Sequence, residues 1–195
     1  MAGRPPFILA SASPRRLDLL RQVGLAPDAI ETATLDERPL ARELPRASAL
    51  RLAAAKAAVV AERYPRAVVL GADTVVALGR RVLPKAADAA AARDCLARLS
   101  GRRHVVYTAV CVIDADGCAR RRLAATRVRF KRLSAGEVAA YIASDEWRGK
   151  AGGYAIQGRA AAFIPWINGA PSTVVGLPLY ETVGLLAAAG VVAAS

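Results

Sequence analysis

Near its start the chain carries a strand, a tight turn and a helix in direct succession, and this unit constrains the fold more than any other feature. Phe7–Ala10 is an apolar run that predicts a short buried strand, which Ser11 ends. Ser13 is typical of a helix N-cap, and Pro14 of a first helical position. The apolar face of that helix ends at Gly24, a residue suited to a helix C-terminus. A strand that passes directly into a helix is the repeating unit of α/β proteins.

The rest of the chain continues this alternation. Helices are expected over residues 47–63, 88–99, 134–144 and 179–189, and strands over 67–71, 105–113, 123–131, 163–167 and 174–175. Polar residues 31–46 predict a loop, and the glycine-rich segment 149–158 predicts a functional loop. No internal repeat and no dividing linker is visible. Residues 1–195 are therefore expected to form a single α/β domain.

The chain is strongly basic, with a formal net charge of +12 over 195 residues. Such a balance favours anionic partners, namely phosphates, nucleic acid or a membrane surface. The alternative is an arginine-rich surface that reflects composition alone. The charge therefore directs attention to phosphate sites without identifying one.

Cysteine usage and the length of the apolar runs bear on the compartment. Cys95, Cys111 and Cys118 form no Cys-x-x-Cys pair and are odd in number, which argues against a zinc site and a disulfide framework. Charged residues interrupt each apolar run before it reaches the roughly 20 residues that a membrane span needs. The N-terminus lacks the pattern of a signal peptide. We therefore expect a cytoplasmic protein that contacts no membrane.

Two arginines, Arg15 and Arg16, occupy the first turn of the predicted N-terminal helix. Positive charge there opposes the helix dipole and costs roughly 0.3–1 kcal/mol per residue. A bound anion reverses the argument, because free backbone N–H groups, the hydroxyls of Ser11 and Ser13, and two guanidinium groups would then converge on a phosphate. The alternative is that both arginines point into water.

Lysine is scarce in this chain, which holds 24 arginines but only Lys56, Lys85, Lys131 and Lys150. A retained lysine can indicate a need for a compact point charge in place of a planar fork. Lys56 and Lys85 are the candidate phosphate ligands on this ground. The alternative, survival of a lysine by chance, applies to any one of them and suits Lys131 best.

Asp73 is the most informative carboxylate. It follows a buried strand, at the end where open α/β sheets place their ligands. A carboxylate there can hold a metal ion or take a proton from water. Asp36 and Glu37 offer a second acidic pair on the polar loop. The alternatives are a turn residue for Asp73 and a solvated loop for the other two.

Several familiar motifs are absent from the sequence. There is no Gly-x-x-x-x-Gly-Lys-Ser/Thr phosphate loop and no Gly-x-Gly-x-x-Gly dinucleotide fingerprint. His104 is the single histidine, so a serine–histidine triad or a cluster of histidine metal ligands is not expected. A structural role for His104 is the simpler interpretation.

A series of short segments, taken in their order along the chain, makes the sequence resemble the Maf family of nucleotide pyrophosphatases along nearly the whole length of the chain. The matching segments are Leu9 to Arg16, Asp36-Glu37, Ala53 to Ala57, Gly71 to Val76, Lys85, Leu99 to Gly101, Tyr107-Thr108, Lys150 to Gly158 and Val175 to Leu179. Each segment is modest alone, but their joint order and spacing are specific. One departure is visible, because the proline that usually follows the family's lysine precedes it here, as Pro84-Lys85.

The resemblance implies hydrolysis of a nucleoside triphosphate to the monophosphate and pyrophosphate with a divalent cation, Mg²⁺ or Mn²⁺. It implies a mixed central sheet flanked by helices, with two lobes and a cleft, like that of inosine triphosphate pyrophosphatases. Members often dimerise, so a homodimer is an expectation. The implied roles are catalytic base for Asp73, metal ligand for Glu37 and Asp73, and phosphate ligand for Ser11, Arg16, Lys56 and Lys85.

The resemblance also concerns the base. Arg15, Thr74 and Gln157 are similar to the branch of the family that acts on dTTP, UTP and related or modified pyrimidine nucleotides, and differ from the branch that acts on 7-methyl-GTP. An amide such as Gln157 can both donate to and accept from a pyrimidine edge. These three residues are therefore the expected determinants of substrate specificity.

Two other functions compete with hydrolysis. A nucleic-acid-binding protein would explain the net charge and the run Arg120-Arg121-Arg122, although a basic turn would explain that run equally. A nucleotide-binding regulator of cell division without catalysis is the second alternative. The carboxylates at positions 37 and 73 argue against an inactive enzyme.

Overall fold

The computed structural model describes residues 4–193. The elements are β1 Phe7–Ala10, α1 Pro14–Gln22, β2 Ala29–Ile30, α2 Pro45–Ala61, β3 Val68–Leu78, β4 Arg81–Leu83, α3 Ala89–Leu99, β5 Arg103–Ile113, β6 Ala119–Arg129, α4 Ala135–Ala143, the 3-10 helix η1 Arg159–Phe163, β7 Trp166–Asn168, α5 Pro171–Val175 and α6 Leu179–Ala188. A seven-stranded sheet in the order β2-β1-β3-β5-β6-β7, with β4 beside β3, forms the centre. The α/β expectation is confirmed.

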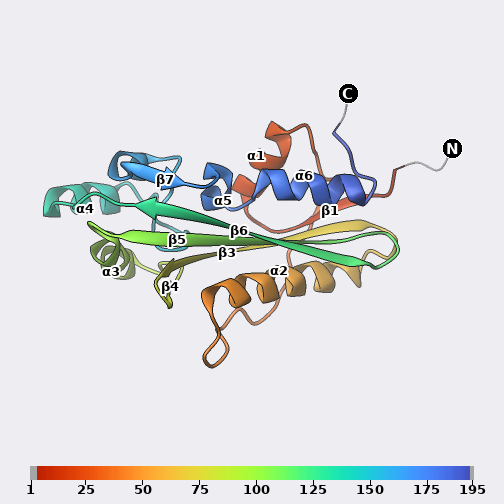
Figure 1. Ribbon diagram of the computed structural model, residues 1–195, viewed down its shortest axis with the longest axis horizontal. Coiled ribbons are helices and arrows are strands. Elements are labelled where there is room, and N and C mark those ends of the chain that lie inside the picture. Colours follow the sequence, from red (N-terminus) through yellow and green to blue (C-terminus); the bar gives the residue numbers. More distant parts are fainter. Residues whose placement is uncertain (1–3, 194–195) are drawn as a thin grey trace.

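The sheet is mixed, and helices cover both of its faces. β1 runs parallel to β2 and β3, whereas β5 is antiparallel to both of its neighbours, β3 and β6. Helix α2 lies against one face, and α1 and α6 lie against the other (Figure 1). Helices α3 and α4 lie toward one end of the long strands β3, β5 and β6, and β1 and α6 lie toward the other end (Figure 1). The long strands therefore connect two lobes.

Three groups of buried side chains form the core. One lies between the sheet and α1 and α6 and includes Leu9, Leu70 and Leu186. A second lies under α2 and is made largely of small residues, because alanines of α2 pack on the sheet. The third is richer in aromatic residues, includes Trp147 and Phe130, and belongs to the lobe of α3 and α4. Burial of these apolar side chains drives the fold.

One edge of β3 is interrupted, and this interruption positions the site. On that edge β3 pairs with β1 as far as Gly71 and with β4 from Val76 onward. Among the described strands, none pairs with Ala72–Val75 on that edge. Asp73 and Thr74 lie in this unpaired stretch of β3. Because successive side chains in a strand point to opposite faces, the two residues project to opposite sides of the sheet.

Close packing of α2 on β3 requires a glycine at position 71. A Cβ atom there would lie 2.4 Å from the carbonyl oxygen of Ala53 and 2.6 Å from the backbone nitrogen of Ala57. Both atoms belong to the backbone of α2. Gly71 therefore lets α2 approach β3 closely at Ala57, the residue that follows Lys56.

The sequence pattern predicted β1, α1, α3, α4 and α6 well. Asp88 caps α3 by accepting from the backbone of Ala91, and Ser134 and Glu137 form the expected capping box at α4. Ser13 stands at the N-cap of α1, but its side chain accepts no capping hydrogen bond. None of the helices within residues 4–193 is long and apolar enough to cross a bilayer.

Other boundaries were wrong. β3 continues to Leu78, because β5 pairs with it as far as Ala77, so Asp73 lies inside the strand and not after it. Residues 174–175 belong to helix α5, whose first position is Pro171, a residue that favours a helix start. Residues 159–163 form a 3-10 helix, and the short strand β7 follows only at 166–168.

Candidate active site

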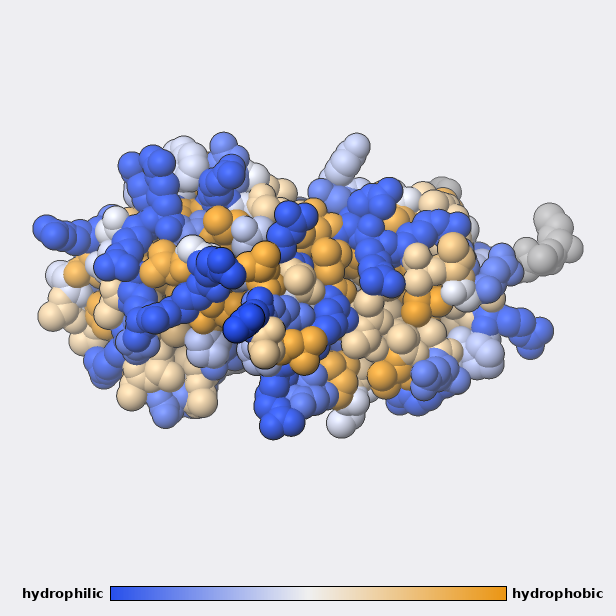
Figure 2. Space-filling model, turned by 60° about the horizontal axis from the view of Figure 1, so that its bottom comes forward, coloured by the Kyte–Doolittle hydropathy of each residue, from blue (hydrophilic) through white to orange (hydrophobic). Residues whose placement is uncertain are grey.

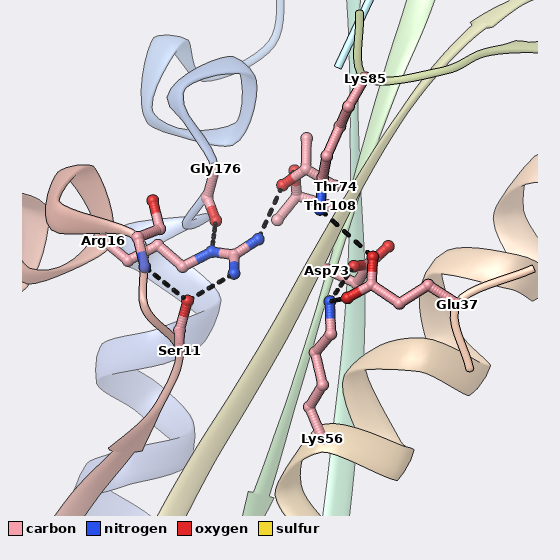
Figure 3. A network of polar contacts seen from close by, with 10 residues as sticks. Ser11, Arg16, Glu37, Lys56, Asp73, Thr74, Lys85, Thr108 and Gly176 are labelled. Carbon is pink, nitrogen blue, oxygen red and sulfur yellow. Dashed lines mark hydrogen bonds and ion pairs between the residues drawn. The ribbon is translucent and has the colours of Figure 1, made fainter. Parts of the chain in front are cut away.

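A cleft of about 370 Å³ opens at the interrupted edge of β3. Ser11, Arg16 and Lys56 line it from one lobe, and Lys150 and Tyr154 line it from the other. Nine of the sequence candidates for catalysis, metal, phosphate or base line this cleft: Ser11, Arg15, Arg16, Glu37, Lys56, Asp73, Thr74, Lys85 and Gln157. Asp36 does not line it, because its exposed carboxylate pairs with Arg38. Figure 3 shows most of them converging from β1, α1, β3 and α2.

Lys56 joins the two candidate acidic residues. Its Nζ lies 2.6 Å from Oδ1 of Asp73 and 2.7 Å from Oε1 of Glu37 (Figure 3). Lys56 and Asp73 are both buried, whereas Glu37 reaches in from the loop before α2 and stays partly exposed. A buried ammonium with two carboxylate partners has its desolvation offset by close Coulomb attraction. The cluster also holds the Asp73 side chain in place at the cleft.

Lys85 completes this cluster from the chain segment after β4. Its Nζ lies 3.2 Å from Oε2 of Glu37. Partial burial would raise the pKa of Glu37, but the ammonium groups of Lys56 and Lys85 outweigh it and lower that pKa below its usual value. The displaced Pro84 therefore does not keep the Lys85 charge from the cleft. A β-bridge from Lys85 to Ala151 further ties this segment to the glycine-rich loop.

Arg16 is buried and fixed on the other side of the cleft. Its Nε donates to the carbonyl of Gly176 at 2.8 Å, Nη1 donates to Oγ of Ser11 at 2.8 Å, and Nη2 donates to Oγ1 of Thr74 at 3.3 Å (Figure 3). Burial lowers the pKa of the Arg16 guanidinium, and the negative charge of Asp73 opposes that shift. A guanidinium has five N–H groups, so two remain for a ligand.

Ser11 accepts two hydrogen bonds and keeps its own hydrogen for a ligand. Its Oγ receives Nη1 of Arg16 and the backbone N–H of Ser13. The hydroxyl hydrogen has no acceptor among the described side chains, and the residue lines the cleft. Ser11 and Arg16 together present donors, which suits an anionic ligand.

Arg15 and Gln157 lie where the cleft meets a second hollow of about 560 Å³ between α1 and α5, which both residues also line. Neither side chain hydrogen bonds any residue within 4–193. Partial burial lowers the pKa of Arg15, which has no carboxylate partner in the described part of the chain. Both side chains are therefore available to a ligand.

Sequence reasoning missed several residues of the cleft, namely Arg148, Lys150 and Tyr154. Lys150 is partly buried, and burial together with the positive charge of Arg15 lowers its pKa. Arg15 and Lys150 both line the cleft, and cations gathered at one cleft suit an anionic ligand. The scarcity of lysine was the signal that could have identified Lys150, but it was applied only to Lys56 and Lys85.

The two acidic residues suit a divalent metal that arrives with a phosphate ligand. No cluster of three or more histidine, cysteine, aspartate or glutamate side chains suited to a metal occurs in residues 4–193. Glu37 and Asp73 nevertheless bring two carboxylates to the cleft, and Lys56 contacts one oxygen of each. Mg²⁺ is commonly held by one or two carboxylates plus substrate phosphates, so this donor set fits.

Two other sequence candidates lie outside the cleft. Arg120-Arg121-Arg122 belong to β6 and not to a turn, and Arg120 pairs with Asp114 at 2.5 Å. None of the three lines the cleft. His104 is buried, with Nε2 placed 2.8 Å from the hydroxyl of Tyr154, and burial lowers its pKa to about 4. A structural role for His104 agrees with this placement.

Comparison with known proteins gives a consistent result. The family model described as Maf-like protein matches residues 6–189. The chain is similar to proteins named dTTP/UTP pyrophosphatase: that of Rhodospirillum rubrum is 61% identical over 95% of this chain and 88% of the relative, and that of Caulobacter vibrioides is 57% identical over 97% and 98%. The solved nucleoside-triphosphatase / dITP/XTP pyrophosphatase from Mycobacterium abscessus aligns with a TM-score of 0.43 and 18% identity, over 67% of this chain and 75% of that chain. Because the family model and the relatives span nearly all of its length, this chain belongs to the Maf family.

Proposed function

We propose that this protein hydrolyses dTTP, UTP and related or modified pyrimidine nucleoside triphosphates to the monophosphate and pyrophosphate. The observation that carries the proposal is the cluster of Asp73, Lys56 and Glu37, which faces the donors of Ser11 and Arg16 across one cleft. Relatives that share more than half of the sequence are named dTTP/UTP pyrophosphatase, which supports this substrate class.

Asp73 acts as the base. It takes a proton from a water molecule whose oxygen attacks the α-phosphorus of the nucleotide. The bond from that phosphorus to the oxygen bridging to the β-phosphate breaks, and this oxygen leaves with pyrophosphate. The ion pair with Lys56 holds the carboxylate in position, which supports proximity catalysis.

The positive groups stabilise the charge of the leaving pyrophosphate. Ser11 and Arg16 offer an O–H and two N–H groups from one wall, and Lys56 and Lys85 offer ammonium groups from the other. Fixed donors of this kind need no reorganisation as charge develops. Lys150 adds a cation from the second lobe.

Glu37 and Asp73 would hold a divalent cation, Mg²⁺ or Mn²⁺, together with the phosphates. When bound, such a cation neutralises the triphosphate and polarises its oxygens. The two carboxylates contribute oxygen ligands, which hard cations prefer. Arg15, Thr74 and Gln157 contact the base in this proposal. The proposal also includes a cytoplasmic location and a homodimer. Light scattering would test the dimer by measuring the molar mass in solution.

Asp73→Asn tests the proposal most directly. This isosteric change removes the base, so pyrophosphate release should fall by about 10²–10⁴-fold if Asp73 is the general base. Nucleotide binding, measured by calorimetry, should remain. Asp94→Asn is the matched control, because Asp94 is an exposed residue of α3 whose one ion pair within residues 4–193 is with Arg98.

The activity screen should cover purine and pyrimidine nucleoside triphosphates, with and without metal. Near-normal turnover in Asp73→Asn would remove Asp73 from the role of base. Equal rates for purines and pyrimidines would contradict the substrate class.

A gel-shift series tests the nucleic-acid alternative, because true binding of nucleic acid should weaken steeply as the salt concentration rises. Figure 2 shows hydrophilic side chains scattered over one face of the molecule with hydrophobic residues between them, not gathered into one stripe.

A further inference from the structure

Thr108 is a fully buried threonine of β5 that stands behind the cleft and to which the proposed mechanism assigns nothing. It lies opposite Thr74 in the register of β3 and β5. Its Oγ1 is 2.7 Å from the carbonyl oxygen of Thr173 and 3.0 Å from Oγ1 of Thr74 (Figure 3 shows Thr74 and Thr108 side by side). Thr108 has one hydroxyl hydrogen, so it cannot serve both partners fully.

The carbonyl of Thr173 decides where that hydrogen goes. Thr173 lies in the short helix α5, among the last residues of the helix, whose carbonyls lack an intrahelical partner. A carbonyl can only accept, whereas a hydroxyl can donate. Both contacts are satisfied only when Thr108 donates to the carbonyl and Thr74 donates to Thr108.

Arg16 fixes Thr74 from the other side. Nη2 of Arg16 donates to Oγ1 of Thr74 at 3.3 Å, and a guanidinium nitrogen cannot accept. The hydrogen of Thr74 is therefore directed inward to Thr108, and one of its lone pairs is occupied by Arg16. What Thr74 still presents to the cleft is a lone pair, so it acts toward a ligand as an acceptor.

We propose that Thr108 is a positioning residue for specificity: by holding the Thr74 hydroxyl as an acceptor, it selects a pyrimidine that carries a hydrogen on ring nitrogen 3. Uracil and thymine have this N–H, whereas cytosine has a lone pair there. An acceptor facing a lone pair is repelled and left unpaired, which is how polar sites reject analogues. The inference rests on the proposed pyrimidine triphosphate hydrolysis.

Gln157 cannot make this distinction by itself. At ring position 4, next to nitrogen 3, uracil carries an oxygen that accepts a hydrogen bond, whereas cytosine carries an amino group that donates one. Because an amide carries both a donor and an acceptor, Gln157 can rotate to match either one. Its side chain is exposed and is not held by another described residue. The fixed hydroxyl of Thr74 is the contact that does not adapt.

The test compares kcat/KM for UTP and CTP in the wild type and in Thr108→Val, measured as pyrophosphate release. The wild type should prefer UTP by about 10- to 100-fold, the range expected for one mismatched buried hydrogen bond. Thr108→Val frees the Thr74 hydrogen to turn toward the cleft and donate to cytosine, so the preference should fall several-fold toward unity. Thr108→Ser keeps the hydroxyl and should retain the wild-type ratio.

Thr126→Val is the matched control, because Thr126 is also fully buried and also donates to a backbone carbonyl near α5, that of Ala170 at 3.0 Å. A general loss of packing lowers both rates together and leaves the ratio unchanged, as expected for Thr126→Val. If Thr108→Val does not fold, Thr108→Ala replaces it, because alanine introduces no new methyl group against the carbonyl.

Three results would overturn the inference. They are equal wild-type values for UTP and CTP, an unchanged ratio in folded Thr108→Val or Thr108→Ala, and a lost preference in Thr108→Ser. The failure of the proposed function looks different: the wild type then releases no pyrophosphate from any pyrimidine triphosphate with metal present, and the role of Thr108 falls with it.

Discussion

Gly71→Ala should damage stability and activity through one added methyl group. The new Cβ would stand 2.4 Å from the carbonyl oxygen of Ala53, and ordinary contact begins at 3.4 Å, so about 1 Å of movement is required. The obstacle is the backbone of α2, which cannot rotate away as a side chain could. The helix as a whole must therefore move from the strand.

This movement also reaches the cluster of Lys56, Asp73 and Glu37. Lys56 precedes Ala57, the second residue that the new methyl group would meet, at 2.6 Å from its nitrogen. The Lys56–Asp73 ion pair of 2.6 Å would lengthen toward 3.6 Å, beyond hydrogen-bonding distance. Overpacking of this kind costs typically about 1–3 kcal/mol. A misplacement of about 1 Å in a catalytic site can cost on the order of 10²-fold in rate.

Urea denaturation followed by circular dichroism measures the first effect, and pyrophosphate release measures the second. Gly184→Ala is the control, because Gly184 lies within α6 and a Cβ there meets no atom within 4 Å. That variant should be stabilised by roughly 0.5–1 kcal/mol, since alanine favours a helix interior. Gly71→Ala with the stability and turnover of Gly184→Ala would refute the close-packing argument.

Three further predictions concern pH and capping. Burial lowers the pKa of His104 from 6.5 to about 4. The stabilisation that comes from keeping His104 neutral is therefore fully present above pH 6.5 and is lost as the pH falls toward 4. The loss between pH 7 and 5.5 should be on the order of 1 kcal/mol by linkage, and His104→Gln should flatten the urea midpoints over this window, whereas equal slopes would contradict it. The hydrogen bond from Arg51 lowers the pKa of Glu43 to about 2, so the destabilisation by Glu43→Gln at neutral pH should shrink as the pH falls from 4.5 toward 2, and a constant difference would oppose the assignment. Ser134→Ala should lower stability by about 1 kcal/mol in thermal denaturation, because it removes the N-cap of α4.

The sequence carried the local structure where a residue acts on its own neighbourhood. Pro14 marked the start of α1, and Ser134 marked that of α4. Prediction failed where a distant partner decides. β5 extends β3 past Asp73, and the two-residue strand β2 exists only because β1 lies beside it. A local pattern cannot contain such partners.

The site followed the same division. The scarcity of lysine indicated Lys56 and Lys85 in advance, and the position of Asp73 beside a predicted buried strand indicated Asp73. The family resemblance supplied the roles expected of all three. The sequence did not indicate that Lys56 would bridge two carboxylates, since 17 positions separate Lys56 from Asp73. The family resemblance included Thr108 but gave it no role, because the proposed role depends on a hydrogen bond to the carbonyl of Thr173, 65 positions away.

In the proposed function, the interrupted edge of β3 separates the contact with the base from the activation of water. Asp73 faces α2 and the charged cluster, and its neighbour Thr74 faces Arg16 and α5. The apolar side chains on the two faces belong to different parts of the core, so the packing beside Thr74 is separate from the packing beside Asp73. Under the proposed roles, a substitution that packs only against Thr74 could change the accepted base while the Lys56–Asp73 ion pair on the other face of the sheet is retained.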